Sequence, residues 1–349
     1  MQVSDFTRQD KRWVVLSDGA QPTEDIYFLE SAAPILRAQG ARIERMDTRR
    51  YRLPARFSLG GIKGANLLIV RSLGVRWVRL IERHRECFGR IVYLIDDDLG
   101  AVSKTPGLPA AYVKRLSKLA AHQPALLGLA DEVVACCDAL VRQLTLQHNK
   151  VSILTPPMLA PLPDLDHFEK SEWTIGYHGT RAHRSDIAYL APALERVMKT
   201  HEDTQLEIMM GRHLPSELSK LARLTAPEAL PWRPFKQYQA SRRIHIGLAP
   251  LLDTPFNRGK SWIKFLDITA MGGVGVYSRR APFTDIVEHG VNGLLVGDDL
   301  NEWQAAIELL LNDREAAFAM AERAQRKAQE IGNAQVCAEF WEKVFSESP

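Results

Sequence analysis

The amino-acid sequence predicts an α/β protein built from two doubly wound parallel sheets, one in each half of the chain. Short apolar segments alternate with longer helical segments, which is the pattern of parallel strands joined by crossover helices. Most of the apolar segments lack polar alternation, as strands buried on both faces do. A proline-rich stretch, residues 155–164, separates the two halves, and we interpret it as part of a linker between two domains.

In the first half, six segments have the apolar character of strands, and helical segments lie between most of them. The expected strands are residues 13–16, 42–46, 65–70, 90–95, 130–135 and 151–154. The expected helices are residues 26–39, 74–87, 110–121 and 138–146. Because the strands are expected to be parallel, their carboxyl ends meet at one edge of the sheet, where open α/β sheets bind ligands.

Three adjacent carboxylates, Asp96 to Asp98, directly follow the strand at residues 90–95. They are therefore expected at the ligand-binding edge. We take Asp97 and Asp98 as candidate catalytic residues that would contact the hydroxyl groups of an acceptor or assist proton transfer from one. Two alternatives stay open: the carboxylates could bind a divalent metal, as a D-x-D motif does, or they could cap a helix and solvate a loop.

The second half repeats the alternation of strands and helices. Its expected strands are residues 175–179, 206–210, 246–252 and 274–277, and its expected helices are residues 187–199, 238–243, 262–271, 298–311, 313–331 and 334–345. The first strand runs into a turn in which glycine lets the backbone approach a ligand. His178 in this turn is therefore a candidate catalytic residue, although a lone histidine is more often structural. Gly179 in the same turn is a candidate for close approach to a ligand.

The most informative stretch is residues 246–296. After its first strand comes a loop that proline and glycine keep out of regular structure, and Ser261 is suited to cap the helix that follows. Arg258, Lys260 and Lys264 crowd around the start of this helix, where unpaired N–H groups and the helix dipole already favour an anion. The stretch therefore predicts an anion site. The simpler interpretation of Lys264, three residues before an aspartate, is a surface salt bridge.

The same stretch resembles the C-terminal domain of GT-B glycosyltransferases, and within them the retaining family 4. The family pattern is K-x-x-E-A-x-A-x-G-x-P-V-V-x-S, followed by N-G-x-L-V. The matching residues here are Lys264, Asp267, Ala270, Gly272, Ser278 and the segment 292–296. The resemblance covers about residues 173–331 and is looser before them.

The resemblance implies a GT-B fold, in which two Rossmann-like domains face a central cleft. It implies an acceptor-side domain at residues 1–156, a linker at 157–172, a donor-binding domain at 173–333 and a helix at 334–349 that packs back on the first domain. It also implies an enzyme that moves a sugar, with retention of configuration, from a nucleotide-diphosphate sugar to a glycan or lipid-linked acceptor, as in the synthesis of cell-surface polysaccharides or glycolipids. Neither a metal nor another cofactor is expected.

By resemblance, the donor-binding residues would be Gly179, Arg181, Phe235, Arg258, Lys260, Ser261, Lys264 and Asp267. His183 and Arg184 are alternatives to Arg181. Asp267 would hold the ribose hydroxyls, and Lys264 with the preceding loop would hold the diphosphate. The sequence departs from the family at two positions. The first glutamate of the family's pair is replaced by Gly259, and Asp267 replaces the second. Residues 256–261 instead match an F-N-x-x-K-S variant of some branches.

Three alternative functions stay open. A GT-B sugar-nucleotide epimerase or hydrolase would share the diphosphate site. A non-catalytic nucleotide-sugar- or glycan-binding protein would explain the missing glutamate at Gly259. An enzyme of the GT-A kind would use Asp96 to Asp98 to hold a metal.

Composition and charge limit the class of protein. The chain has 349 residues, of which 46% are hydrophobic and 25% charged, as in globular proteins with room for two cores. No apolar run approaches the roughly 20 residues of a membrane span, and the N-terminus lacks the order of a signal peptide. The four cysteines form no CxxC pair, so neither a zinc site nor a disulfide framework is indicated. A cytoplasmic protein is expected.

Arginine is concentrated in the first half, although the net charge is only +3. Residues 42–56 and residues 71–90 each contain six arginines against two acids. A basic helix at residues 74–87 could rest on the anionic inner face of a membrane, and a solvated arginine-rich face explains the composition equally well. No aromatic interleaving or binding motif points to nucleic acid.

Overall fold

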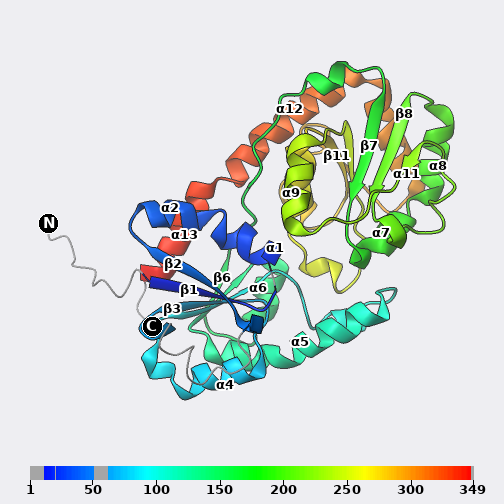
Figure 1. The fold of residues 1–349 in the computed structure, drawn as a ribbon. Helices are drawn as coiled ribbons and strands as arrows, with labels where there is room; N and C mark the ends of the chain where they lie inside the picture. The colour runs from blue at the N-terminus through cyan, green and yellow to red at the C-terminus, as the bar shows by residue number, and fades with distance from the viewer. Residues whose placement is uncertain (1–11, 20, 51–61, 347–349) are drawn as a thin grey trace.

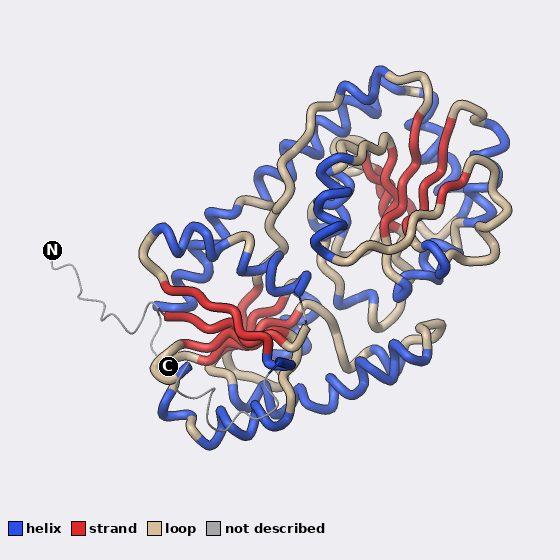
Figure 2. The backbone as a smooth tube through the Cα atoms, viewed as in Figure 1, coloured by secondary structure: helices blue, strands red, loops and turns tan. Residues whose placement is uncertain are grey.

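The computed structural model describes residues 12–19, 21–50 and 62–346. Within these ranges the chain forms two six-stranded parallel sheets, each with helices packed against it, in two separate lobes (Figures 1 and 2). The predicted α/β fold with two doubly wound parallel sheets is therefore confirmed. None of the described helices is long and apolar enough to cross a membrane.

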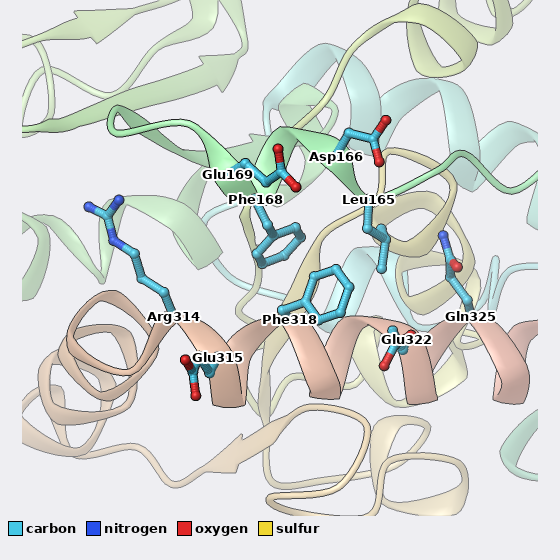
Figure 3. A pocket seen from close by; sticks show the side chains of 9 residues that line it. All are labelled: Leu165, Asp166, Phe168, Glu169, Arg314, Glu315, Phe318, Glu322 and Gln325. Atoms are coloured by element: carbon cyan, nitrogen blue, oxygen red, sulfur yellow. The ribbon is translucent and has the colours of Figure 1, made fainter.

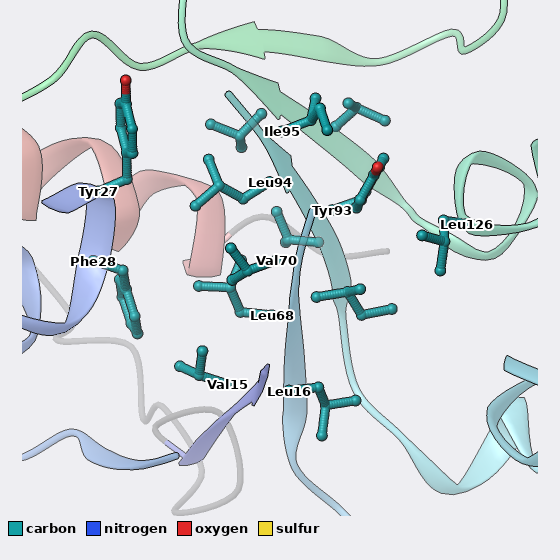
Figure 4. Close-up of a cluster of buried hydrophobic side chains, with 14 of the residues drawn as sticks. Val15, Leu16, Tyr27, Phe28, Leu68, Val70, Tyr93, Leu94, Ile95 and Leu126 are labelled. Carbon is teal, nitrogen blue, oxygen red and sulfur yellow. The ribbon is translucent and has the colours of Figure 1, made fainter. Parts of the chain in front are cut away.

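The first sheet is made of segments that are apolar because both of its faces are covered. In spatial order it consists of β2 (Arg42–Asp47), β1 (Arg12–Ser17), β3 (Asn66–Val70), β4 (Ile91–Ile95), β5 (Glu132–Ala135) and β6 (Val151–Ile153). Its helices include α1 (Gln21–Glu24), α2 (Ala32–Ala38), α4 (Val75–Arg83), α5 (Ala110–Leu129) and α6 (Asp138–Leu144). All side chains of β3 and β4 are buried, and some of them are seen in Figure 4.

The second sheet has the same construction. In spatial order it consists of β12 (Leu294–Val296), β11 (Val274–Ser278), β10 (Ile246–Ala249), β7 (Trp173–His178), β8 (Thr204–Met209) and β9 (Leu224–Thr225). Its helices include α7 (Arg184–Ala188), α8 (Ala191–Thr200), α9 (Trp232–Ser241), α10 (Ile263–Ala270), α11 (Leu300–Asn312) and α12 (Arg314–Ile331).

Several predicted boundaries differ from the structure. The helix expected at residues 26–39 is divided into a π-helical turn, η1 (Asp25–Leu29), and α2. The strand expected to reach residue 252 ends at Ala249, directly before a proline that cannot donate to the ladder. The prediction that Ser261 caps the next helix is wrong. The N-cap is Trp262, and the hydroxyl of Ser261 instead lies 3.3 Å from that of Tyr27 in the first lobe.

The chain passes between the lobes twice, and the two crossings touch. The segment that follows β6 leads into the second lobe, and α13 (Ala334–Ser346) returns to the first after α12 (Figure 1). The Met158 N–H donates to the Gly332 carbonyl over 2.9 Å. A Cβ on Gly332 would lie 2.6 Å from the Cβ of Met158, so only glycine permits this close approach.

Helix α13 completes the core of the first lobe. It packs against α2, and Trp341 at its centre is fully buried beside Phe28. The indole N–H of Trp341 donates to the Tyr27 carbonyl over 2.7 Å. The last described helix is therefore part of the first hydrophobic core, although the second lobe lies between them in the sequence.

Candidate functional site

A cavity of about 430 Å³ lies between the lobes, at the carboxyl ends of strands from both sheets. From the first lobe it is lined by Thr23, Tyr27, Arg71, Asp96 and Asp97, among others. Its wall in the second lobe includes Thr180, Arg181, Lys260, Ser261 and Lys264. This is where open α/β sheets bind ligands. The structure thus brings three predicted site segments, one from the first half of the chain and two from the second, into one cavity.

Four charged side chains join the lobes inside this cavity. We call Arg71, Asp96, Asp97 and Lys260 the charged quartet. The Lys260 ammonium lies 2.5 Å from Asp97 Oδ1, and the Arg71 guanidinium contacts both Asp97 and Asp96, with Arg71 Nε 3.1 Å from Asp96 Oδ1. Two cations and two carboxylates therefore neutralise one another, and the Lys260–Asp97 pair crosses the domain interface.

Burial and pairing have opposite effects on the pKa values of the quartet. Burial alone would raise the pKa of Asp97, but Lys260 and Arg71 outweigh it and hold that pKa below its usual value. Burial would likewise lower the pKa of Lys260, and Asp97 raises it instead. Burial does raise the pKa of Asp96, against the pull of Arg71. The Asp97–Lys260 contact is thus an ion pair at neutral pH.

Arg71 was not found from the sequence. It follows β3 directly and has a φ of 59°, a left-handed conformation that is uncommon for a residue with a side chain. The Tyr93 hydroxyl donates to the Arg71 carbonyl over 2.9 Å and holds the backbone there. The rule that drew attention to Asp96 to Asp98, a charged side chain just beyond a buried strand, also applies to Arg71.

Asp98 does not line the cavity. Its Oδ1 accepts from the Ala101 N–H over 3.0 Å and from the Gln143 amide over 3.2 Å, so it stabilises the turn after β4 and does not cap a helix. Gly259 of the second lobe is pressed against Asp98, because an added Cβ there would lie 2.9 Å from Asp98 Cβ and 3.3 Å from Asp98 N. Gly259, which the resemblance aligns with a glutamate of the family pattern, therefore occupies a position with no space for a side chain.

The loop between β10 and α10 is anchored on the first lobe. Phe256 is fully buried in the first hydrophobic core, and its N–H donates to the Thr105 hydroxyl over 3.0 Å. The Asn257 amide stabilises the loop from within through the Leu252 carbonyl at 2.9 Å. The Lys260 ammonium lies 3.8 Å from the centre of the Phe256 ring, a cation–π contact. The F-N-x-x-K-S segment thus holds the two lobes together.

His178 is the last residue of β7 and is buried next to the cavity. Its Nε2 is 2.9 Å from Glu207 Oε1, and its carbonyl accepts from the Lys264 ammonium. Burial would raise the pKa of Glu207, but hydrogen bonds from His178 and Tyr238 lower it to about 2. Within the described structure His178 is not among the residues that line the cavity, so its expected catalytic role stays a prediction.

Asp267 is held from two sides. Its Oδ2 lies 3.1 Å from the Lys264 ammonium, and its Oδ1 accepts from the Gln239 amide over 2.9 Å. Gln239 is buried on α9. The sequence offered no signal for Gln239, because the helix that carries it is separated from Asp267 by a strand and a loop.

The remaining expected donor-binding residues are spread out. Arg181 lines the cavity and, within the described part of the chain, forms no ion pair. The backbone of Gly179 lies against the Tyr177 ring. Arg258 points to solvent with 66% of its side chain exposed and pairs with Asp253. Phe235 lies in the first turn of α9, beside the indole ring of Trp232. Neither Phe235 nor Arg258 is part of the cavity wall.

Two other features are less suited to a diphosphate or a catalytic metal. A hollow of about 500 Å³ beside α12 is lined by Phe168 and Phe318 and by more acids than cations (Figure 3). Among the described residues, His84, Glu86 and Cys87 are the group whose ligand atoms lie within 4.8 Å of one another. They follow α4 and do not line the interdomain cavity. The carboxylates of residues 96–98 do not form such a group.

No protein-family model matches the sequence, and no curated protein sequence matches it either. The structure, in contrast, is similar to solved glycosyltransferases. A sucrose-phosphate synthase from Thermosynechococcus elongatus superposes with a TM-score of 0.68 at 15% identity, over 96% of this chain and 98% of that chain. HepE from Anabaena in complex with UDP and glucose gives a TM-score of 0.65 at 13% identity, over 96% and 99%.

The pneumococcal O-GlcNAc transferase GtfA, solved with UDP and GlcNAc, is also similar, with a TM-score of 0.59 at 13% identity. It covers 82% of this chain, which corresponds to 57% of that chain. Identities this low show a shared fold, and the predicted placement in family 4 stays a prediction. The two parallel sheets, the cavity between them and these similarities together show that the chain has the GT-B fold of glycosyltransferases.

Proposed function

We propose that the protein is a glycosyltransferase that moves a sugar from a nucleotide-diphosphate sugar to a glycan or lipid-linked acceptor. The observation that carries the proposal is the interdomain cavity, in which Arg181, Lys260 and Lys264 supply positive charge from the second lobe. Such charge stabilises a departing diphosphate in a site partly closed to water. The similar structures that contain UDP support a nucleotide donor and make UDP-sugars the first donors to test.

The donor is proposed to lie against the second lobe. Arg181 and Lys264, with the start of α10, would bind the diphosphate, and Asp267 would accept hydrogen bonds from the ribose hydroxyls. The acceptor would enter from the first lobe, where Asp97 lines the cavity. In this proposal Asp98 and His178 shape the site through the contacts of their own segments.

The proposed chemistry retains the configuration of the sugar. The bond between the anomeric carbon and the diphosphate oxygen breaks, and the acceptor oxygen bonds to the same face of that carbon. The acceptor proton passes to the leaving diphosphate, so no protein nucleophile is required. We also propose that the reaction needs no metal, because lysine and arginine supply the charge. Activity that survives EDTA is expected, whereas loss of activity would favour a metal enzyme that uses Asp96 to Asp98.

The first experiment is thermal unfolding in the presence of UDP-, GDP-, ADP- and dTDP-sugars. A donor at a hundredfold excess over its Kd should add about 3 kcal/mol to the free energy of unfolding. If no nucleotide sugar raises the unfolding temperature, the donor site is wrong. If a donor does bind, the Lys264→Ala variant should lose turnover as well as affinity for that donor.

A non-catalytic nucleotide-sugar- or glycan-binding protein is the second candidate, and the packing of Gly259 against Asp98 favours it, because that packing leaves no room for the family's first glutamate. This candidate predicts binding without turnover for every acceptor tried. An epimerase or hydrolase would instead release a changed or free sugar without an acceptor, which product analysis detects.

We further propose that the first lobe rests on an anionic membrane surface during the synthesis of a polysaccharide or glycolipid. Helix α4 packs Trp77 and Ile81 into the first hydrophobic core and exposes Arg76, Arg79 and Arg83, so its attraction to an anionic surface would be electrostatic. Arg52 and Arg56, which belong to the same basic region of the sequence, lie outside the described residues. Sedimentation with phosphatidylglycerol vesicles, but not with phosphatidylcholine vesicles, is the expected result.

A further inference from the structure

One of the cations that line the cavity, Lys260, already has an anionic partner. The Lys260 ammonium lies 2.5 Å from Asp97 Oδ1, and the two side chains are only 18% and 10% exposed. They come from opposite lobes, and both line the interdomain cavity. A carboxylate oxygen and a phosphate oxygen both accept charge-assisted hydrogen bonds from a lysine ammonium. An anionic ligand that binds Lys260 must therefore compete with Asp97.

The competing carboxylate is firmly held. Arg71 binds Oδ2 of Asp97, whereas Lys260 binds Oδ1. The left-handed backbone at Arg71 is fixed by the Tyr93 hydroxyl. On the other side, the ammonium of Lys260 is held over the Phe256 ring. The pair is therefore part of a built interface, unlike two flexible side chains that meet on a surface.

The enclosed cavity strengthens both the attraction of a diphosphate to Lys260 and its repulsion by Asp97. Charges interact more strongly in a partly enclosed site than in water. A diphosphate placed beside the intact Asp97–Lys260 pair would gain little from the neutralised lysine and would be repelled by Asp97. Once the pair opens, Arg71 remains as a partner for the Asp97 carboxylate, so the carboxylate is not left without a counter-charge.

We propose that, in the free protein, the Asp97 carboxylate lies where the donor's diphosphate would contact Lys260. The donor then binds by displacing this carboxylate from the Lys260 ammonium. Asp97 thereby sets the affinity for the donor. Displacement also releases one of its carboxylate oxygens toward the acceptor side of the cavity. This inference rests on the proposed function, because it requires that a nucleoside diphosphate binds in the cavity.

The test is a double-mutant cycle with UDP, whose Kd is measured by calorimetry at low and moderate salt. Asp97→Asn should bind UDP about five- to tenfold more tightly than the native protein, because Lys260 is then unopposed. Lys260→Gln should bind it more weakly. In the Lys260→Gln background, Asp97→Asn should no longer tighten UDP binding, because there is no ammonium left for which Asp97 and the diphosphate compete.

Different outcomes overturn different claims. If the native protein binds UDP and Asp97→Asn leaves the Kd unchanged or weakens it, the competition is wrong and the proposed function stands. If Asp97→Asn tightens binding equally in the Lys260→Gln background, the effect is general repulsion and the competition is again wrong. If the native protein binds none of UDP, GDP, ADP and dTDP, the proposed function itself fails.

Two controls keep the cycle interpretable. Glu30→Gln breaks another ion pair between the lobes, the one with Lys236, and should leave the Kd for UDP unchanged. Tightening by Glu30→Gln would mean that looser lobes, and not a freed Lys260, improve binding. Asp97→Ala serves as a second variant if the asparagine amide destabilises the fold, and thermal unfolding of each variant without ligand shows which ones are native.

Discussion

His245 illustrates how one buried side chain makes stability depend on pH. Its ring is stacked on Trp173, with 4.7 Å between ring centres. Nδ1 accepts from the Thr174 N–H over 2.9 Å, and Nε2 donates to the His167 carbonyl over 2.8 Å. Both nitrogens are thus satisfied only in the neutral ring. Burial lowers the pKa of His245 to about 4.

We therefore expect stability to fall as the pH drops from about 6.5 toward 4. In that window the unfolded chain binds a proton at residue 245 and the folded protein does not, so acid favours unfolding. The effect of this one group is about 3 kcal/mol at most. Urea denaturation at pH 7.5 and pH 4.5 measures it. His245→Phe should be less stable at pH 7.5 but lose less on acidification, and an equal loss in both proteins would contradict the assignment.

Gln239 allows a second test at the level of a single residue. If Asp267 binds the ribose, the amide that orients its carboxylate should sharpen recognition of the sugar hydroxyls. Gln239→Leu should then reduce the preference for UDP over 2′-deoxy-UDP about three- to tenfold. The ratio of the two Kd values is the readout, because a general structural defect would weaken both nucleotides alike. Gln237→Leu is the matched control, since Gln237 is exposed on the same helix.

The sequence identified candidate site residues by their charge and position, but it did not show in which direction each side chain points. Lys260, Lys264 and Asp97 were expected at ligand-binding edges, and all three line the cavity. Arg258 has the same charge and is a near neighbour, yet it points to solvent. The direction of a loop side chain depends on how the loop packs against the other lobe, and this contact cannot be predicted from the local sequence.

At the level of elements, the loop between β10 and α10 depends on its glycine. A Cβ at residue 259 would meet both the Cβ and the backbone nitrogen of Asp98, which have little freedom to move away. Gly259→Ala should therefore cost about 1–3 kcal/mol of stability, measured by thermal unfolding. Gly128→Ala is the control, because nothing lies within 4 Å of its added Cβ. That helical site should gain about 0.5–1 kcal/mol.

Elements were predictable where they are long and regular. The strands of both sheet centres and the helices α11 and α12 lie where apolar runs and periodicity placed them. The very short β9 and β12 contain two and three residues, too few to show a period. The pattern at residues 26–39 did not indicate the π-helical turn. In this turn Phe28 contacts Trp341 of α13, a residue far along the chain that no local pattern reveals.

At the level of the whole molecule, α13 contributes to the stability of the first lobe. Trp341 is fully buried there and hydrogen-bonded to Tyr27. Trp341→Ala should destabilise the protein by about 3–5 kcal/mol. Val336→Ala, at a position that is 59% exposed on the same helix, should change stability by no more than about 0.5 kcal/mol. Urea denaturation followed by far-UV circular dichroism compares the two, and similar losses would show that α13 is not part of that core.

The overall fold was the most predictable property, because the alternation of strands and helices in each half specifies a doubly wound sheet and the motif of the second half specified its type. The arrangement of the lobes was less accessible. The contacts of Phe256, Gly259 and Lys260 with the first lobe join residues more than a hundred positions apart, and no local pattern in a single sequence encodes them.

The contact between Met158 and Gly332 has a mechanical consequence. Both tethers between the lobes run through this point, so any rotation of one lobe against the other would have to bend the chain there. Such a rotation would also have to break the Lys260–Asp97 and Lys236–Glu30 pairs, which join the lobes. Access to the cavity is in this way linked to the geometry of Gly332, although Gly332 does not line the cavity.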